Sequence, residues 1–166
     1  MKKYELTNET KVVLGTTLYR IRALISFGNV HAGDLGGWVE KESNLAQDGN
    51  AWVSGNARVS GNAWVYGNAE VSGNAEVSGD AWVSGNAWVL KSDHLLTVGA
   101  IGSRDGITTF FRTKDKQIKV SCGCFLGTVA EFADKVKQTH GDGKHAKTYA
   151  IAIELAKAQI EDVEDK

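Results

Sequence analysis

The chain has 166 residues and a formal net charge of −1, which suits one domain or two small ones and gives no reason to expect polymeric nucleic acid as a partner. Two cysteines are too few for a disulfide framework. We see no signal peptide and no apolar run long enough to span a membrane, so we expect no membrane partner and a soluble, cytoplasmic protein.

Residues 1–38 predict an N-terminal β-rich cap. Tyr4–Leu6 has the composition of a short strand. Val12–Val13 and Leu18–Ile25 flank Gly15, which predicts a hairpin with its turn at the glycine.

A six-residue unit, Gly-Asn-Ala-x-Val-y, occurs seven times in residues 49–90, with one Asn replaced by Asp. A fixed six-residue period is typical of a solenoid of short parallel strands. Ala and Val are two positions apart, so both point to one side and fill a narrow core, while Gly and Asn suit the corners. Val39 and Leu45 fall in phase with the Ala column, and we therefore expect the β-helix to occupy residues 39–94.

The repeat resembles the hexapeptide repeats of left-handed β-helix proteins. That resemblance implies three units per triangular coil, so that residues eighteen apart stack on one face. The expected fold is mainly β: a short left-handed parallel β-helix of about three coils, with an N-terminal β cap and a C-terminal cap.

The outward position between Ala and Val carries aromatic side chains on two of the three expected faces. Trp64 should stack on Trp82, and a charged column should pair Arg58 with Glu76. Exposed aromatic surface usually marks an interface, so we expect a homo-trimer or another closed oligomer. A platform for a planar ligand remains the alternative. The expected oligomer-interface residues are Trp52, Trp64, Trp82 and Trp88.

Residues 95–166 predict a ββαα cap, with strands at Thr108–Thr113 and Ile118–Phe125. Residues 97–150 contain nine Lys or Arg and five Asp or Glu, a balance of +4, whereas residues 48–90 have a balance of −3. An anionic ligand should therefore prefer the cap to the repeats.

Two helices are expected to follow these strands. Thr128 and Glu131 form a capping box for the first, and Gly141 ends it. The second should run over Lys144–Ile160, and residues 161–166 should fray.

A binding site for a phosphate-bearing ligand is one interpretation of the basic cap. Arg112 offers a fork of donors to phosphate, and either Phe110 or Phe111 could stack on a base, depending on which way the sheet faces. A solvated surface is the alternative explanation of the lysines. The expected ligand-binding residues are Arg104, Phe110, Phe111, Arg112, Lys114, Lys119, Phe125 and Lys147.

Cys122 and Cys124, with His140 and His145, have the ligand types of a tetrahedral zinc site. However, one residue separates the cysteines, whereas zinc knuckles place two there. Strand alternation also puts both cysteines on an apolar face, so we interpret them as small core residues and expect no metal and no cofactor.

Many left-handed β-helix proteins are acyltransferases that use an acyl-CoA donor and a histidine as general base. Residues 48–90 contain no histidine, and His94 is the main candidate base. We therefore favour a non-catalytic protein and keep the acyltransferase as an alternative.

Six segments outside the repeats carry a second resemblance: Tyr4–Thr7, Leu18–Leu24, Gly33–Gly37, Phe110–Asp115, Val120–Phe125 and Thr139–Asp142. In them the chain resembles hexapeptide-repeat proteins encoded by phages and prophages of Gram-positive bacteria. The resemblance implies a host cytoplasm and a role in the contest between phage and host. The preferred hypothesis is an oligomer that sequesters a small nucleotide-like immune signal, as an anti-defence sponge. The alternative is a structural or protein-interaction module.

Overall fold

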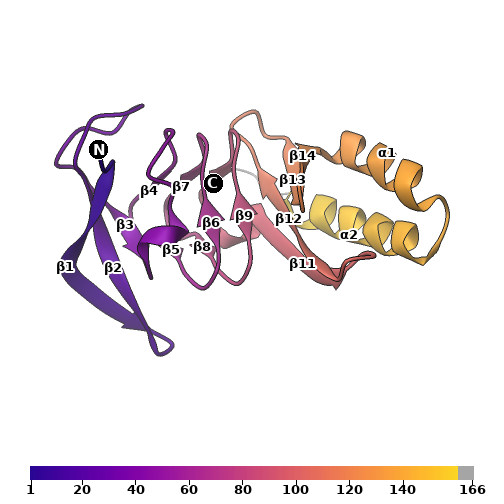
Figure 1. Cartoon of the computed structure of the whole chain (residues 1–166), viewed down its shortest axis with the longest axis horizontal. Helices are drawn as coiled ribbons and strands as arrows, with labels where there is room; N and C mark the ends of the chain where they lie inside the picture. Colours follow the sequence, from indigo (N-terminus) through magenta and orange to yellow (C-terminus); the bar gives the residue numbers. More distant parts are fainter. Residues whose placement is uncertain (161–166) are drawn as a thin grey trace. The chain divides into compact units, whose positions relative to one another are not determined.

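The computed structural model describes residues 1–160, which form two compact units. The first unit is Met1–Ser92, and the second begins at Asp93. The first unit is built mainly of β-strands, whereas the second combines a β-sheet with two α-helices (Figure 1). Within residues 1–160, neither helix is long and apolar enough to cross a membrane. The expected fraying of residues 161–166 lies outside the described residues.

An antiparallel hairpin opens the first unit. It joins β1 (Tyr4–Val13) to β2 (Thr16–Ala23), and β3 (Leu35–Val39) pairs with β2 on the other side. Leu14 and Gly15 both have positive φ, 49° and 83°, which makes the tight turn that the sequence predicted at the glycine. The sequence predicted two separate strand fragments, Tyr4–Leu6 and Val12–Val13, because the residues between them are polar. In the structure both belong to one strand, whose pairing with β2 shifts register between Leu6 and Thr10.

The seven repeats form seven two-residue strands: β4 (Trp52–Val53), β5 (Arg58–Val59), β6 (Trp64–Val65), β7 (Glu70–Val71), β8 (Glu76–Val77), β9 (Trp82–Val83) and β10 (Trp88–Val89). All pair in parallel, β4 with β7 and β7 with β10, β5 with β8, and β6 with β9. Paired residues are eighteen apart, so three repeats complete one turn, as expected. The parallel β-solenoid is thereby confirmed.

The solenoid core consists of the repeated Ala and Val side chains, each at most 1% exposed. Backbone amides donate to carbonyls of the next turn, as from Trp52 to Ala69 at 2.9 Å. The corners need glycine: at Gly49, with φ of 65°, an added Cβ would lie only 2.6 Å from the carbonyl oxygen of Gly67. One six-residue sequence therefore satisfies the core, the ladder and the corner together.

The N-terminal segment satisfies the backbone of the first solenoid turn. The Lys3 ammonium donates to the carbonyl oxygens of Asp48 at 3.2 Å and Ala51 at 2.8 Å. On the next face, the Trp38 amide from β3 donates to the Ala57 carbonyl at 3.0 Å. Open sheet edges are prone to pair with other chains, and these bonds occupy the groups that would do so.

The irregular start of the solenoid corrects one expectation. Val39 pairs with Val59 and Leu45 pairs with Val65, so both belong to the Val column and not to the Ala column. Each pair is twenty positions apart, because the corner after Leu45 is two residues longer than those of the regular repeats. A short 3-10 helix, η1 (Glu42–Asn44), precedes Leu45.

The second unit contains a four-stranded antiparallel sheet where the sequence predicted two strands. Its order is β11 (Leu95–Ile101), β12 (Gly106–Arg112), β13 (Ile118–Cys122) and β14 (Phe125–Thr128). The predicted strand 118–125 breaks at Gly123, whose φ of 57° reverses the chain and creates the β13–β14 hairpin. β11 was missed altogether.

Two helices complete this unit, α1 (Val129–His140) and α2 (Lys144–Ile160), both as predicted. The capping box is present: the Glu131 amide donates to the Thr128 hydroxyl at 3.2 Å, and the Thr128 amide donates to the Glu131 carboxylate at 2.7 Å. Gly141 follows α1 with φ of 57°.

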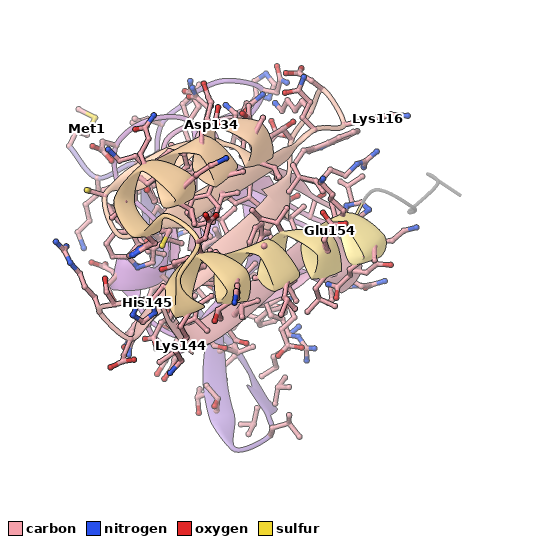
Figure 2. The ribbon with its side chains drawn as sticks, turned by 90° about the vertical axis from the view of Figure 1, so that its right-hand side faces the viewer. Met1, Lys116, Asp134, Lys144, His145 and Glu154 are labelled. Atoms are coloured by element: carbon pink, nitrogen blue, oxygen red, sulfur yellow. The ribbon has the colours of Figure 1, made fainter. Side chains whose placement is uncertain are left out.

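The helices cover one face of the four-stranded sheet (Figure 2). Phe132 of α1 is central, with its ring centroid 6.3 Å from that of Phe110 and 5.3 Å from that of Tyr149. Val120 and Ile153 are buried around them. The core of this unit is therefore formed by a few large side chains, and their contacts do not repeat along the chain.

Candidate functional site

The aromatic face of the solenoid, which we define as Trp64, Tyr66 and Trp82, is the candidate functional surface. Trp64 and Trp82 occupy paired positions of β6 and β9. Trp82 is 43% exposed, and the other two are half-buried. Three large rings in contact at the surface form an apolar patch, and exposed apolar patches are where binding sites on protein surfaces are found when the patch is large.

The geometry within the aromatic face differs from the expected indole stack. Trp64 stacks on Tyr66, with centroids 4.0 Å apart and planes at 17°. Trp82 meets Trp64 edge-on, at 5.6 Å and 87°. Tyr66 was missed by the sequence reasoning, although a signal existed, because it alone among the seven repeats places an aromatic residue at the sixth position.

Trp52 does not lie on an open surface, although its repeat position points outward. It is 7% exposed because Tyr4 and Phe27 pack edge-on against it, at 6.4 Å and 5.4 Å. Trp88, in the same column, is half-buried. The N-terminal segment thus covers part of the interface that the sequence assigned to an oligomer.

The charged column behaves as predicted, with Arg58 and Glu76 paired at 2.8 Å. The column continues to Trp38, where the Lys11 ammonium lies 4.2 Å and the Arg20 guanidinium 5.4 Å from the ring centroid. Burial, together with the Arg58 and Arg20 charges, lowers the pKa of Lys11. These cation–π contacts hold the hairpin against the solenoid.

The predicted ligand-binding aromatics lie in the packed core. Phe110 and Phe111 are both 0% exposed, on opposite faces of β12, so neither ring is open for a base to stack on. Phe125 is half-buried and packs against Phe132 at 5.3 Å. Arg112 is 3% exposed. Sequence alternation identified the two faces of this strand but could not reveal that both are covered.

The predicted basic residues do not gather at one place. Arg104 lies in the turn between β11 and β12, and Lys114 in the turn between β12 and β13, which are opposite ends of β12. Lys119 shares its sheet face with Phe111, whereas Lys147 belongs to α2, which packs on the other face. The positive balance of this unit is therefore spread over its surface.

Cys122 belongs to a small polar contact inside the second unit. The Thr108 hydroxyl donates to Cys122 Sγ at 3.3 Å, and the Tyr149 hydroxyl lies 3.8 Å from the same sulfur. Burial first, and then the neighbouring thiol, raise the pKa of Tyr149 to about 12. Cys124 is exposed, contrary to the expectation of a core position, because β13 ends at Cys122 and the chain turns at Gly123.

The two histidines considered as zinc ligands do lie together. The His140 and His145 rings are 5.4 Å apart, and His140 stacks on Tyr149 at 6.0 Å. Within residues 1–160, however, no three His, Cys, Asp or Glu side chains are grouped so that they could hold a metal ion.

The candidate acyltransferase base is enclosed. His94 ends the 3-10 helix η2 (Ser92–His94) and is 0% exposed. A general base must reach the proton it removes, directly or through one water. His31 is exposed and sits 3.7 Å from the Asp34 carboxylate, in a turn of the first unit.

Known proteins match part of this chain. Residues 51–67 match a family model described as the YdcK β-solenoid repeat. A stretch of 61 residues is 39% identical to the protein named "Uncharacterized acetyltransferase YdcK" of Escherichia coli strain K12. The match covers 32% of this chain and 19% of the relative, so it spans about a fifth of the relative's length. The similarity concerns a β-solenoid of hexapeptide type and agrees with the strand pairing.

Proposed function

We propose that this protein is a non-catalytic, self-associating module, a left-handed β-helix of about three coils that joins copies of itself through the aromatic face. The observation that carries the proposal is the 43% exposure of Trp82 beside the stacked Trp64 and Tyr66 rings. A homo-trimer or another closed oligomer buries such a face on every copy.

Physical considerations favour protein contact over a free surface. Trp and Tyr are enriched among the few residues that dominate binding energy, and truncating one at the centre of an interface costs about 2 kcal/mol or more. The charged column pairs Arg58 with Glu76 at the surface, where such a pair contributes about 0–1 kcal/mol. One face of the solenoid is thus suited to assembly and another to solvent.

Sedimentation equilibrium at micromolar concentration tests the proposal. We expect a multiple of 17.9 kDa for the native chain, and a smaller mass for Trp82→Ala. Arg58→Ala is the matched control, because it alters an outward residue of another column without changing the aromatic face. A native monomer, or equal losses in both variants, would contradict the proposal.

A nucleotide-sequestering role in a host cytoplasm is the more specific form of the hypothesis. Its support is the sequence balance of +4 in residues 97–150 and the phage-type resemblance. The burial of Phe110 and Phe111 removes the base-stacking surface on which it relied. Calorimetry with cyclic and ADP-ribose-type nucleotides tests it, and absence of heat with all of them leaves the self-associating module as the better account.

An acyltransferase is the second candidate, because the matched relative carries an acetyltransferase name. Catalysis would need a base, and residues 48–90 contain no histidine. Incubation of the native oligomer with acetyl-CoA and an amine or hydroxyl acceptor panel measures this directly. Release of free CoA above the His94→Ala background would favour the enzyme.

A further inference from the structure

The tip of the β1–β2 hairpin exposes apolar side chains on a strained backbone. Leu14 is 98% exposed and Val12 is 68% exposed. Leu14 also has a φ of 49°, in the left-handed region that asparagine and glycine adopt more readily than leucine. Asn followed by Gly is the preferred pair for such a two-residue turn. A leucine at this position is unfavourable for both the backbone and the solvation of the tip, so its presence calls for a reason outside the turn.

The hairpin projects beyond the strand that pairs with it. β3 ends at Val39, which pairs with Tyr19 of β2. Three further pairs of the hairpin, which join residues 11–13 to residues 16–18, have no partner in β3. At about 3.4 Å per residue, these three pairs make an arm of about 10 Å, which we define as residues 11–18 and call the hairpin arm. Figure 1 shows it extending past the neighbouring turns of the solenoid.

The hairpin arm leaves the aromatic face of its own chain open. Both lie in the first unit, and within it Trp82 keeps 43% exposure while Leu14 keeps 98%. One chain therefore presents two separate apolar surfaces, one on a projecting arm and one on a flat face of the solenoid. The two surfaces can cover each other only if they belong to different copies.

We propose that the hairpin arm of one copy packs on the aromatic face of the next copy, with Leu14 and Val12 against the Trp82 ring. The inference rests on the self-association proposed above and names the surface that covers the aromatic face. Because the arm and the face are different parts of one chain, the contact runs head to tail from copy to copy. Such contacts close into a ring, as in a homo-trimer, when the rotation between copies allows it.

Charge favours this pairing over its alternatives. Lys11 is the single charged residue of the hairpin arm. Asp80 is the single charged residue of the two repeats that carry the aromatic face, residues 61–66 and 79–84. An arm on a face therefore brings opposite charges together, whereas two faces or two arms in contact would set like charges side by side.

Sedimentation equilibrium of Leu14→Asn tests the arm. The substitution removes the apolar side chain at the tip and leaves the aromatic face intact, and we expect assembly to weaken by about tenfold or more. Leu24→Asn is the matched control, because Leu24 is 41% exposed just beyond the other end of β2. Equal effects of the two variants would overturn the proposal. A native oligomer that Trp82→Ala dissociates and Leu14→Asn does not would overturn the arm contact alone and leave self-association through the face intact.

A mixture of two defective chains tests the head-to-tail order. Leu14→Asn keeps an intact face and Trp82→Ala keeps an intact arm, so each alone should remain near 17.9 kDa. In an equal mixture, the arm of the second chain should bind the face of the first and give a complex of two chains. Pairing of face with face predicts no such complex, so a mixture that stays at 17.9 kDa at every concentration contradicts the proposal.

Thermal unfolding separates a role in assembly from a role in folding. In the Trp82→Ala chain, which should not assemble, Leu14→Asn relieves the turn and should raise the midpoint of the fluorescence transition by about 2–5 °C. The same substitution should thus stabilise the single chain and weaken the oligomer. A lower midpoint would mean that Leu14 serves the fold of its own hairpin, against the proposal.

Co-sedimentation with phosphatidylglycerol vesicles tests a lipid surface as the occupant of the tip. We expect the native chain and Leu14→Asn to stay in solution alike. Binding of the native chain that Leu14→Asn abolishes would assign the tip to lipid and overturn the contact between copies.

Discussion

The two units of this protein reach stability by opposite routes. In the first, one six-residue sequence repeats the same core and corner contacts seven times, so the core is divided among many small Val and Ala side chains. In the second, a few large side chains meet once, with Phe132 touching three other aromatic rings. Loss of one repeat therefore removes only a small part of the contacts in the solenoid core. Loss of one aromatic ring in the second unit removes the centre of its core.

The chain offers separate probes for the two routes. All five tryptophans lie between positions 38 and 88, in the first unit. Within residues 1–160, both α-helices belong to the second unit. Tryptophan fluorescence therefore reports on unfolding of the first unit, and the helical circular dichroism signal reports on the second.

The largest expected effect is that of Phe132→Ala, which removes the central ring of the second unit. Replacing a buried Phe by Ala costs about 3–5 kcal/mol, and we expect the helical signal to melt at lower denaturant. Val71→Ala in the solenoid should cost about 1–2 kcal/mol and shift mainly the fluorescence transition. If either variant moved both signals equally, the units would unfold together and the contrast between them would be lost.

The next effect compares two corners of the solenoid. Gly73 and Gly79 have φ of 62° and 64°, but an added Cβ lies 2.4 Å from the Leu90 carbonyl oxygen at Gly73 and meets nothing within 4 Å at Gly79. Both alanine variants incur the cost of a left-handed backbone, about 1 kcal/mol. Gly73→Ala should lose about 1–2 kcal/mol more, measured by urea unfolding followed by fluorescence. Equal losses of stability in the two variants would mean that the backbone at Gly73 shifts enough to accommodate the added Cβ.

Sequence reasoning succeeded where contacts are local or recur at a fixed period. The six-residue period predicted the parallel pairing, and the Thr128–Glu131 pattern predicted the start of α1. It failed at the start of the solenoid, where a corner two residues longer than the others shifts Leu45 into the Val column. The six-residue period of residues 49–90 carries no information about the two extra residues in the corner that precedes it.

The candidate surface was predicted in part. The outward Trp positions follow from the repeat, but the covering of Trp52 by Tyr4 and Phe27 depends on residues 48 and 25 positions away. In the second unit, the alternation of β12 gave two faces without showing that both are buried. Long-range packing, which no local pattern encodes, decided both outcomes.

A smaller effect concerns pH and the first solenoid turn. Burial, partly offset by Asp48, lowers the pKa of Lys3 from 10.5 to about 8. Between these values the unfolded chain keeps the proton that the folded chain has released, so the free energy of unfolding should rise with pH from about 8 to 10.5. After allowance for solvent screening, we expect an increase of about 1 kcal/mol.

Lys3→Met removes this titration and is the control. Urea unfolding of both proteins at several pH values between 7 and 10.5, followed by fluorescence, measures the difference. The native chain should gain stability relative to Lys3→Met as pH rises. A relative loss would show that the charged ammonium, bonded to the Asp48 and Ala51 carbonyls, stabilises the turn more than its burial opposes it.

The smallest expected effect is at the Arg58–Glu76 pair, which joins two successive turns at 2.8 Å on the charged column. Both side chains are partly exposed, so the pair should contribute about 0–1 kcal/mol and less in high salt. A double-mutant cycle with Arg58→Gln and Glu76→Gln, measured by fluorescence-monitored unfolding at low and high salt, isolates that coupling. A coupling above about 2 kcal/mol that persists in salt would mean that surface ion pairs, and not only the repeated Val and Ala core, determine the stability of the solenoid.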